Sequence, residues 1–207
     1  AMDDYFVERE DTPKNPDGSY DFECLEAVDL KLFDKQVAEL LNGKEVLRPS
    51  FNFTFGKKEY NETMQMDEDD ILVIEGIHAL DTKVLTNIQR NKKYKIYISA
   101  LTEVNIDNHN RVSTTDNRLL RRIIRDNRTR GYSVDDTLEA WISVRNGEEK
   151  WIFPYQDEAD VLINSAASYE VGVLKTYVEP LLYSVHSDSP YYEEAKRLID
   201  ILRAFLS

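Results

Sequence analysis

Short strand-like runs separated by longer stretches with helical spacing constrain the fold of this chain more than any other feature. The first run, Ile71-Leu72-Val73-Ile74, is apolar at every position and stops at Glu75-Gly76. Two further runs follow at 95–98 and 161–163. A fully apolar run is typical of a central parallel strand that is buried on both faces. Strands that alternate with helices in this way predict an α/β fold with a mostly parallel sheet.

Helices are predicted where apolar residues recur at a period near 3.6. The segments with this pattern are 29–41, 82–89, 118–130, 133–151, the amphipathic stretch around 174–183, and 191–206. The segment 102–112 is either a helix or a polar crossover, and both interpretations stay open. Residues 7–23 have no apolar period and are predicted to form a loop. Phe51–Phe55 alternates aromatic and polar residues, which predicts a half-buried strand or a hairpin arm that ends at Gly56.

Composition excludes several classes of protein. With 207 residues, of which 42% are hydrophobic, the chain is long enough to bury a sizeable core as one domain. Its longest apolar runs are too short to cross a bilayer, so no membrane partner is expected. Cys24 is the one cysteine, which excludes an intrachain disulfide and fits a cytoplasmic protein. The three histidines lack the spacing of a zinc site.

Positive charge is concentrated in one segment of an otherwise acidic chain. The net charge is −13, which opposes binding to nucleic acid unless basic residues are clustered. Six arginines do cluster within 13 residues, and these are Arg118, Arg121, Arg122, Arg125, Arg128 and Arg130. On a helix, four of them, from Arg118 to Arg125, fall largely on one side. This cationic face is either a site for a polyanion, such as the phosphates of a nucleotide, or a solvated helix face.

Two acidic positions are candidates for chemistry. Glu75 ends the apolar run, and the carboxyl edge of a parallel sheet is where α/β proteins bind ligands, so the sequence places a carboxylate where a phosphoryl-transfer enzyme holds magnesium. A solvent-facing glutamate at a strand end is the alternative. Asp3-Asp4 precedes the aromatic pair Tyr5-Phe6, and it is either a general base beside a substrate hydroxyl or a polar chain terminus.

The order of several short motifs resembles the uridine kinase/phosphoribulokinase family. The motifs are Asp3-Asp4-Tyr5-Phe6, Tyr20-Asp21, Arg48-Pro49-Ser50-Phe51-Asn52-Phe53, Ile74-Glu75-Gly76-Ile77, Arg118-Leu119-Leu120-Arg121-Arg122-Ile123-Ile124-Arg125-Asp126 and Ala159-Asp160-Val161. The resemblance covers residues 3–165. It implies a P-loop kinase-like, three-layer αβα fold, with a partial catalytic core at 1–168 and a helical C-terminal extension at 169–207.

The resemblance also implies roles for particular residues, with ATP and Mg²⁺ as cofactors. Asp3 corresponds to the base that activates the substrate hydroxyl, Asp21 to an aspartate that binds ribose hydroxyls, and Glu75 to the carboxylate near magnesium. The arginines correspond to a lid over the triphosphate. We expect Arg121 and Arg122 to act in catalysis, Arg118 and Phe51 to contact the substrate, and Arg125, Arg128 and Arg130 to bind ATP.

The sequence departs from the family pattern at three places. No glycine begins a Walker A motif, because neither Gly43-Lys44 nor Gly56-Lys57 continues into Ser or Thr. The sheet is therefore expected to lack the P-loop strand, and the isolated chain is expected to be inactive and to self-associate through unpaired strand edges. Phe51 and Gly56 stand where uridine kinases have a tyrosine and a histidine, which argues against uridine itself. The tail from Tyr169 resembles that of a bacterial subgroup with an upstream TGS and threonyl-tRNA-synthetase-like region.

Two functions follow from these features. The first is an ATP-dependent kinase that phosphorylates a hydroxyl of a nucleoside or related sugar-containing substrate. The second is a non-catalytic module that keeps the kinase architecture and binds anions or RNA through the arginine helix. For the first, the expected partners are a nucleotide, a small-molecule substrate and a second copy of the chain.

Overall fold

The computed structural model describes residues 1–206, which fold as two compact units. The first unit comprises residues 1–97 and 145–161, and the second comprises residues 98–144 and the chain from 162 onward. The chain therefore passes between the units near residues 97, 144 and 161.

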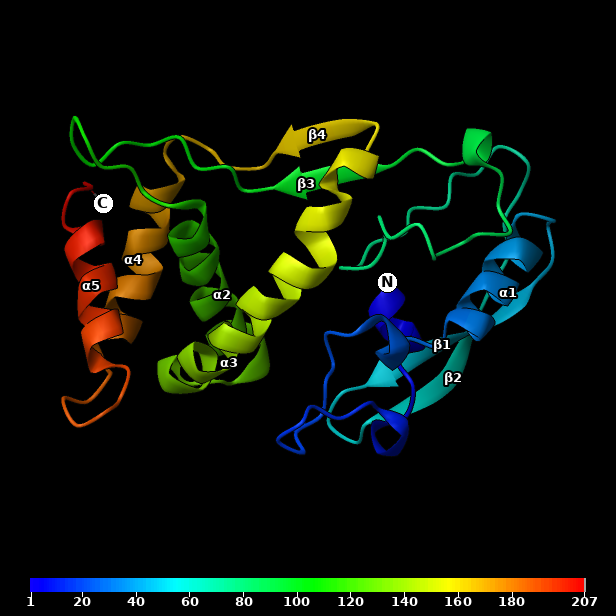
Figure 1. The fold of residues 1–207 in the computed structure, drawn as a ribbon, viewed down its shortest axis with the longest axis horizontal. Helices are drawn as coiled ribbons and strands as arrows, with labels where there is room; N and C mark the ends of the chain where they lie inside the picture. The colour runs from blue at the N-terminus through cyan, green and yellow to red at the C-terminus, as the bar shows by residue number, and fades with distance from the viewer. Residues whose placement is uncertain (207) are drawn as a thin grey trace. The chain divides into compact units, whose positions relative to one another are not determined.

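Helices and short strands alternate along the chain (Figure 1). The helices are α1 (Leu30–Leu40), α2 (Thr114–Arg130), α3 (Val134–Gly147), α4 (Glu170–Tyr183) and α5 (Tyr192–Leu202). The strands are β1 (Val46–Asn52), β2 (Lys57–Met64), β3 (Ile96–Ser99) and β4 (Val161–Asn164). Short 3₁₀ turns lie at Met2–Tyr5, Arg9–Asp11, Leu25–Ala27, Arg90–Lys92 and Phe153–Glu158, and a π-helical turn spans Glu148–Ile152. The prediction of a mixed α/β structure is confirmed.

Helix α1 lies in the first unit and begins where the apolar period predicts. Asp29 caps it, since the side chain accepts a hydrogen bond from the Leu32 N–H at 3.0 Å and another from Lys58 Nζ at 2.7 Å. Burial acts to raise the pKa of Asp29, but these two hydrogen bonds outweigh it and hold the pKa below its ordinary value. The buried face of α1 carries Phe33 and Val37 into the core of the unit.

Strands β1 and β2 form an antiparallel hairpin in the same unit. Its register shifts between Arg48 and Ser50, around Pro49, because proline has no N–H to give to the ladder. The predicted arm at 51–55 is thus the end of β1 followed by the turn that leads to Gly56. Strand β2 has no apolar alternation and is mostly exposed, so the sequence pattern did not predict it.

The predicted central strand at Ile71–Ile74 is not a strand in the structure. The segment has irregular backbone, and in the described residues no backbone hydrogen bond joins it to a neighbouring strand. Leu72 and Ile74 pack on the core, whereas Ile71 and Val73 are 88% and 82% exposed. A parallel strand needs partners that supply its ladder, and an apolar sequence alone does not provide them.

The predicted helix at 82–89 is also wrong, because these residues form consecutive turns. Leu85 has φ of 55°, in the left-handed region that an α-helix excludes. Its N–H donates to Asp34 Oδ1 at 3.1 Å instead of to a carbonyl four residues back. The tertiary contact with Asp34 therefore replaces a local helical bond, while Val84 and Leu85 stay in the core.

Strands β3 and β4 form a small sheet at the place where the chain crosses between the units. The carbonyl of Lys95 accepts from the Asp160 N–H, and the carbonyl of Ser99 accepts from the Ser165 N–H, both at 2.8 Å. Because the partners ascend together along both strands, the pairing is parallel. Both strands agree with the sequence prediction to within one residue.

The second unit is built from helices, with α2 packed against α4 and α4 against α5 (Figure 1). Its core includes Leu120 and Ile123 of α2, Val178 of α4 and Leu198 of α5. Helix α2 ends where predicted, at Gly131, whose φ of 69° is a left-handed conformation that suits glycine. Within residues 1–206, none of the helices combines the length and the apolar character needed to cross a membrane.

Candidate functional site

The N-terminal turn holds Asp3 beside Glu75 in the first unit. The Met2 N–H donates to the backbone carbonyl of Glu75 at 2.9 Å, so the residue next to Asp3 is bound to Glu75 itself. Met2 and Tyr5 are buried, whereas Asp3, between them in the sequence, and Glu75 are both exposed. The pattern of apolar residues on both sides of Asp3-Asp4 thus anchors the turn and leaves its carboxylates at the surface.

Tyr5 fixes the far end of this turn. Its hydroxyl donates to Gln36 Oε1 of α1 at 2.9 Å, and its ring meets Phe33 edge-on with 5.0 Å between the ring centroids. Burial raises the pKa of Tyr5 to about 12, so the phenol stays protonated and keeps donating. The position of Asp3 therefore depends on α1 as well as on Glu75.

Gly76 makes the close approach of the turn to Glu75 possible. A Cβ atom at this position would lie 2.8 Å from the Cβ of Met2, well inside van der Waals contact. Any other residue at 76 would push the N-terminal turn away. The exposed Glu75 is therefore followed directly by the glycine that allows Met2 to approach the Glu75 backbone.

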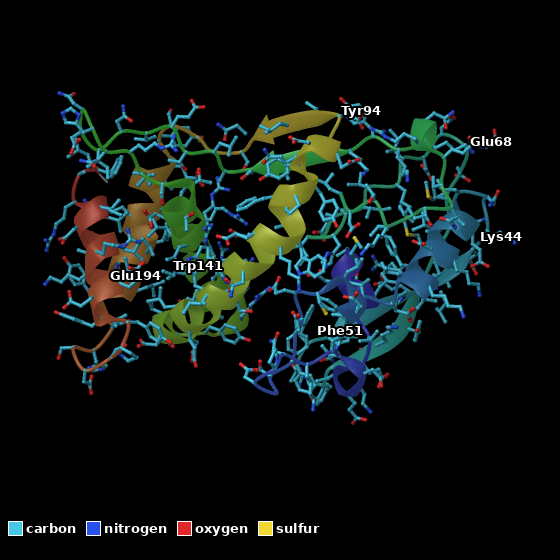
Figure 2. All side chains as sticks on the ribbon, viewed as in Figure 1. Lys44, Phe51, Glu68, Tyr94, Trp141 and Glu194 are labelled. Atoms are coloured by element: carbon cyan, nitrogen blue, oxygen red, sulfur yellow. The ribbon has the colours of Figure 1, made fainter. Side chains whose placement is uncertain are left out.

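Phe51 is buried in an aromatic cluster on the same unit, and Figure 2 labels its position. Its ring centroid lies 5.6 Å from that of Phe6 and 5.2 Å from that of Phe53, with edge-to-face geometry in both pairs. Phe6 follows the turn that carries Asp3, so the cluster joins this turn to the hairpin. The structure thus brings Asp3, Phe51 and Glu75 together around residues 2–6.

Asp21 lies in the predicted loop, and its carboxylate has a local role. Its Oδ1 accepts a hydrogen bond from the Glu23 N–H at 3.1 Å, and its own N–H donates to the Pro13 carbonyl at 2.8 Å. These bonds shape the chain ahead of the 3₁₀ turn at Leu25–Ala27.

The arginine-rich helix α2 belongs to the second unit, and several of its arginines converge on one carboxylate. Asp126 is fully buried on the same helix. Arg122 Nε lies 3.2 Å from its Oδ2, and Arg125 Nη2 and Arg130 Nη1 lie 2.8 and 3.6 Å from its Oδ1. Asp126 is the last residue of the arginine-rich motif at 118–126, and the sequence pattern alone does not indicate its role.

Arg121 is bound to a different carboxylate, on α4. Its Nε donates to Glu170 Oε1 and its Nη2 donates to Oε2 at 2.7 Å, a two-pronged pairing that Asn117 Nδ2 extends with a bond to Oε2 at 3.2 Å. Burial acts to raise the pKa of Glu170, but the hydrogen bonds from Arg121 and Asn117 outweigh it, and the pKa lies below its ordinary value. Arg121 also donates to the Ser165 carbonyl at 2.9 Å.

The remaining arginines of α2 differ in exposure. Arg118 is half-buried near the start of the helix, and Arg128 is exposed near its end. The six predicted arginines therefore lie on one helix but differ in their exposure and in their ion-pair partners. Asp126 and Glu170 are the partners that sequence analysis missed.

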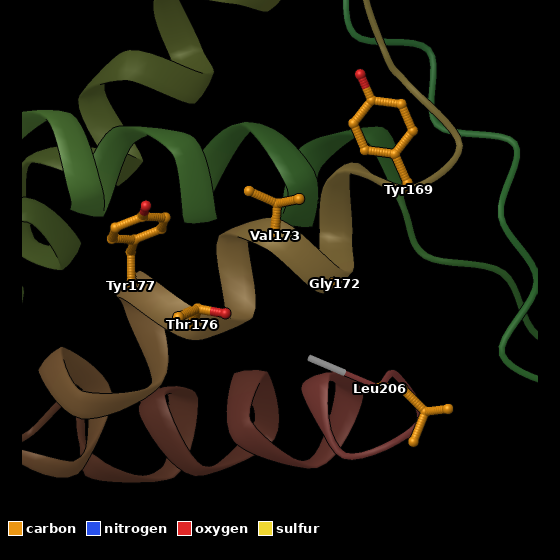
Figure 3. A pocket seen from close by; sticks show the side chains of 6 residues that line it. All are labelled: Tyr169, Gly172, Val173, Thr176, Tyr177 and Leu206. Atoms are coloured by element: carbon orange, nitrogen blue, oxygen red, sulfur yellow. The ribbon is translucent and has the colours of Figure 1, made fainter.

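A shallow apolar hollow of about 320 Å³ lies on α4 beside Leu206 (Figure 3). It is lined by Tyr169, Gly172, Val173, Thr176, Tyr177 and Leu206. Its walls bear no carboxylate, imidazole or cationic side chain, so it offers no group for acid–base or phosphate chemistry. None of the sequence-predicted site residues lines it.

A protein site for a metal ion needs several ligating side chains close together. Within residues 1–206, no cluster of three or more His, Cys, Asp or Glu side chains is placed to hold a metal ion. His78 follows Glu75 closely in sequence but is buried edge-on against Trp151, with 5.3 Å between the rings. Burial lowers the pKa of His78, which keeps it neutral as a packing residue.

Comparison with known proteins agrees with the fold. Helices combined with a small parallel sheet are consistent with a P-loop kinase-like αβα protein. The chain belongs to the Phosphoribulokinase / Uridine kinase family, whose sequence profile matches residues 2–171.

Two similar proteins carry the name uridine kinase. The protein from Staphylococcus haemolyticus (strain JCSC1435) is 28% identical over 148 residues, and the one from Staphylococcus aureus (strain Newman) is 29% identical over 148 residues. In both cases the match covers 71% of this chain and 63% of the relative. The chain thus matches less than two thirds of the length of these relatives.

Proposed function

We propose that this chain is part of an ATP-dependent kinase that transfers the γ-phosphoryl group of ATP to a hydroxyl of a nucleoside or a related sugar-containing substrate. The observation that carries the proposal is the hydrogen bond from the Met2 N–H to the Glu75 carbonyl, because it joins the backbone next to Asp3 to Glu75, and both acidic residues are exposed. Family membership and the printed name of the relatives support the same activity.

Asp3 is proposed as the general base. Its carboxylate accepts the proton of the acceptor hydroxyl while that oxygen bonds to the γ-phosphorus and the bond from the γ-phosphorus to the bridging oxygen of ADP breaks. Phe51 and the neighbouring rings offer an apolar wall for the acceptor, with Asp21 as a ligand for its hydroxyls and Arg118 as a second substrate contact. With phenylalanine at 51 and glycine at 56, this wall offers no side-chain hydrogen bond to a pyrimidine, which favours an acceptor other than uridine.

Glu75 is proposed as the protein ligand of Mg²⁺. Magnesium prefers oxygen ligands and is commonly held by one or two carboxylates together with water and substrate phosphates, so an exposed single glutamate fits this role. When bound, the ion neutralises charge on the phosphates. Asp3 is next in sequence to Met2, whose N–H donates to the Glu75 carbonyl, so the base and Glu75 are held at the same turn.

The arginines of α2 are proposed to bind and stabilise the triphosphate, with Arg121 and Arg122 acting on the transferred group and Arg125, Arg128 and Arg130 on the rest of ATP. Arg121 already pairs with a carboxylate, so its binding to phosphate requires an exchange of ion-pair partner. For Arg121 this exchange means leaving Glu170.

The isolated chain is proposed to be inactive, because no glycine in it begins a Walker A motif. The test measures ATP turnover against a panel of nucleosides and sugar phosphates in the full-length protein. Asp3→Asn should abolish turnover and leave ATP affinity unchanged, whereas Asp4→Asn, the same charge change in the same turn, should retain turnover. Equal turnover by Asp3→Asn and the unmodified protein would exclude Asp3 as the base.

A second candidate is a non-catalytic module that binds anions or RNA through α2. It is favoured by a helix that keeps exposed arginines in a chain without a Walker A motif. This reading expects no turnover by the full-length protein and no effect of Asp3→Asn on anion binding.

We also propose a cytoplasmic protein that self-associates. Cys24 is a buried free thiol, which fits a reducing compartment. Ile71 and Val73 expose apolar side chains on a segment that pairs with no strand in residues 1–206, and this segment can pair with the same segment of a second copy about a two-fold axis. Sedimentation of the isolated chain as a monomer at all concentrations would exclude the self-association.

A further inference from the structure

A carboxylate occupies a position on α2 where the packing pattern calls for an apolar residue. The buried face of the helix runs through Leu119, Leu120 and Ile123, and the next position on that face is Asp126. Its side chain is only 1% exposed. A buried carboxylate is costly unless charged partners surround it, so its retention on this face needs a reason beyond packing.

The partners of Asp126 come from three positions around it on the helix. Arg122 and Arg130 lie one turn before and one turn after it, and Arg125 precedes it directly. The side chains of Arg125 and Arg130 are each 48% exposed, and that of Arg122 is 20% exposed. The carboxylate thus lies inside and the cations lie outside, with three positive charges for one negative charge.

The geometry of Arg125 shows how a guanidinium is oriented by this carboxylate. Both its Nε and its Nη2 donate to Asp126 Oδ1, at 3.0 and 2.8 Å. A guanidinium has five N–H donors in a fixed plane, so bonds along one edge set the direction of the other edge. That outer edge points away from the buried carboxylate, towards the exposed side of the helix.

We propose that Asp126 is a positioning residue for polyanion recognition by α2. It orients Arg125 through two hydrogen bonds and holds Arg122 and Arg130 nearby as ion pairs, so that the outer N–H groups of the three match the spacing of a linear triphosphate. It also limits the net charge, so that binding depends on shape as well as on charge. This inference rests on the proposed function, which assigns these arginines to the triphosphate. The inference adds Asp126 as the buried residue that determines which phosphate anions these arginines prefer.

The test compares Asp126→Asn with a matched variant, Asp116→Asn. Asp116 lies on the same helix and loses the same charge, but its partner is Arg197 at 2.6 Å, outside the arginine group around Asp126. The probes are linear tripolyphosphate and cyclic trimetaphosphate, whose dissociation constants are measured by calorimetry on the 207-residue chain. The preference of each variant for the linear anion is the ratio of its two dissociation constants.

Asp126→Asn is expected to reduce the preference for linear tripolyphosphate at least about fivefold, because the added net charge attracts both anions while the arginines lose their common orientation. Asp116→Asn should keep the preference within about twofold of the unmodified chain. An unchanged preference in Asp126→Asn would overturn the proposal.

A second measurement does not depend on anion binding. The Nε–H resonance of Arg125 in a ¹⁵N spectrum should show an ordered side chain in the unmodified chain and a mobile one in Asp126→Asn. An Arg125 resonance that is equally ordered in both overturns the positioning role. An unmodified chain that binds neither anion, with Arg125 released in Asp126→Asn, refutes the triphosphate assignment in the proposed function and leaves Asp126 a purely structural residue.

Loss of folding in Asp126→Asn would be visible by circular dichroism, and Arg125→Lys then replaces it. This variant changes a half-exposed side chain and keeps its charge, but an ammonium cannot form the two-pronged bond to Oδ1. It is expected to lower the preference for the linear anion at least about twofold, and an unchanged preference would count against the proposal.

Discussion

Glu170→Gln removes the negative charge from the pairing that joins α4 to α2. In the unmodified protein, Glu170 accepts from Arg121 through both oxygens and from Asn117 through one. The glutamine has nearly the same shape, so the substitution tests the charge and leaves the packing of the two helices in place. Arg121 keeps an amide oxygen to donate to but loses its counter-ion.

The expected loss of stability follows from the contacts and from their exposure. Removing one member of a fully buried ion pair costs about 3–5 kcal/mol, whereas exposed pairs contribute about 0–1 kcal/mol. The Arg121 and Glu170 side chains are 33% and 17% exposed, so this pair lies between the two limits. We expect Glu170→Gln to lower the free energy of unfolding by about 2 kcal/mol, which corresponds to a fall in Tm of roughly 4–8 °C for a chain of this size.

The same pair predicts a pH dependence with a definite sign. The pKa of Glu170 is lower in the folded state than its ordinary value of 4.5. Its contribution to stability is therefore complete above pH 4.5 and is lost as the pH falls through the folded pKa. The difference in unfolding free energy between the unmodified protein and Glu170→Gln should shrink over this acidic window and stay constant towards neutral pH.

Urea unfolding followed by far-UV circular dichroism measures these differences. Asp200→Asn is the matched control, because it removes the same charge from an ion pair with Arg203 whose side chains are 55% and 65% exposed. The control should change the unfolding free energy by less than about 0.5 kcal/mol. Equal effects of the two substitutions at neutral pH, or an effect of Glu170→Gln that persists unchanged in acid, would refute the assignment of a stabilising ion pair.

Other substitutions test further contacts. Gly76→Ala should destabilise the first unit by about 1–3 kcal/mol in urea unfolding, since its Cβ would meet Met2 at 2.8 Å, and no loss would mean that the turn approaches Glu75 less closely. Asp29→Ala should cost about 1–2 kcal/mol at neutral pH by removing the cap of α1 and the Lys58 pair, with the cost shrinking in acid as the carboxyl is protonated below its lowered pKa. Gly131→Ala should lower the stability by about 1 kcal/mol in thermal unfolding because alanine is strained at φ of 69°, and an unchanged Tm would contradict the left-handed cap.

Local signals predicted much of the helical structure. Helix α1 was located by its apolar period and helix α2 by its end at Gly131, because capping and periodicity act within a few positions of the chain. Helix α2 begins at Thr114, four residues before the predicted start at Arg118. The strand predicted at Ile71–Ile74 is absent because a strand requires hydrogen bonds to neighbouring strands, and a local apolar run does not specify those partners. The helix predicted at 82–89 is absent for a related reason. The backbone of Leu85 donates a hydrogen bond to Asp34, which is far away in the sequence.

The candidate site shows the same division between local and distant information. The sequence indicated Asp3, Glu75 and the arginines as candidate site residues, but not the hydrogen bond from Met2 that joins the N-terminal turn to Glu75. A closer look at spacing would have found Asp126, because arginines stand four before, one before and four after it. The pairing of Glu170 with Arg121 could not be predicted from local spacing, because the two residues are 49 positions apart in the sequence.

The path of the chain between the units sets an order in which the protein can be completed during synthesis. Residues 1–97 emerge from the ribosome first, but their unit also needs residues 145–161, where Trp151 packs against the core. At a synthesis rate of about 5–20 residues per second, the intervening segment 98–144 imposes a delay of seconds. During that delay the growing chain carries an unfinished apolar surface, which makes it a substrate for chaperones and a starting point for aggregation before the first unit can close.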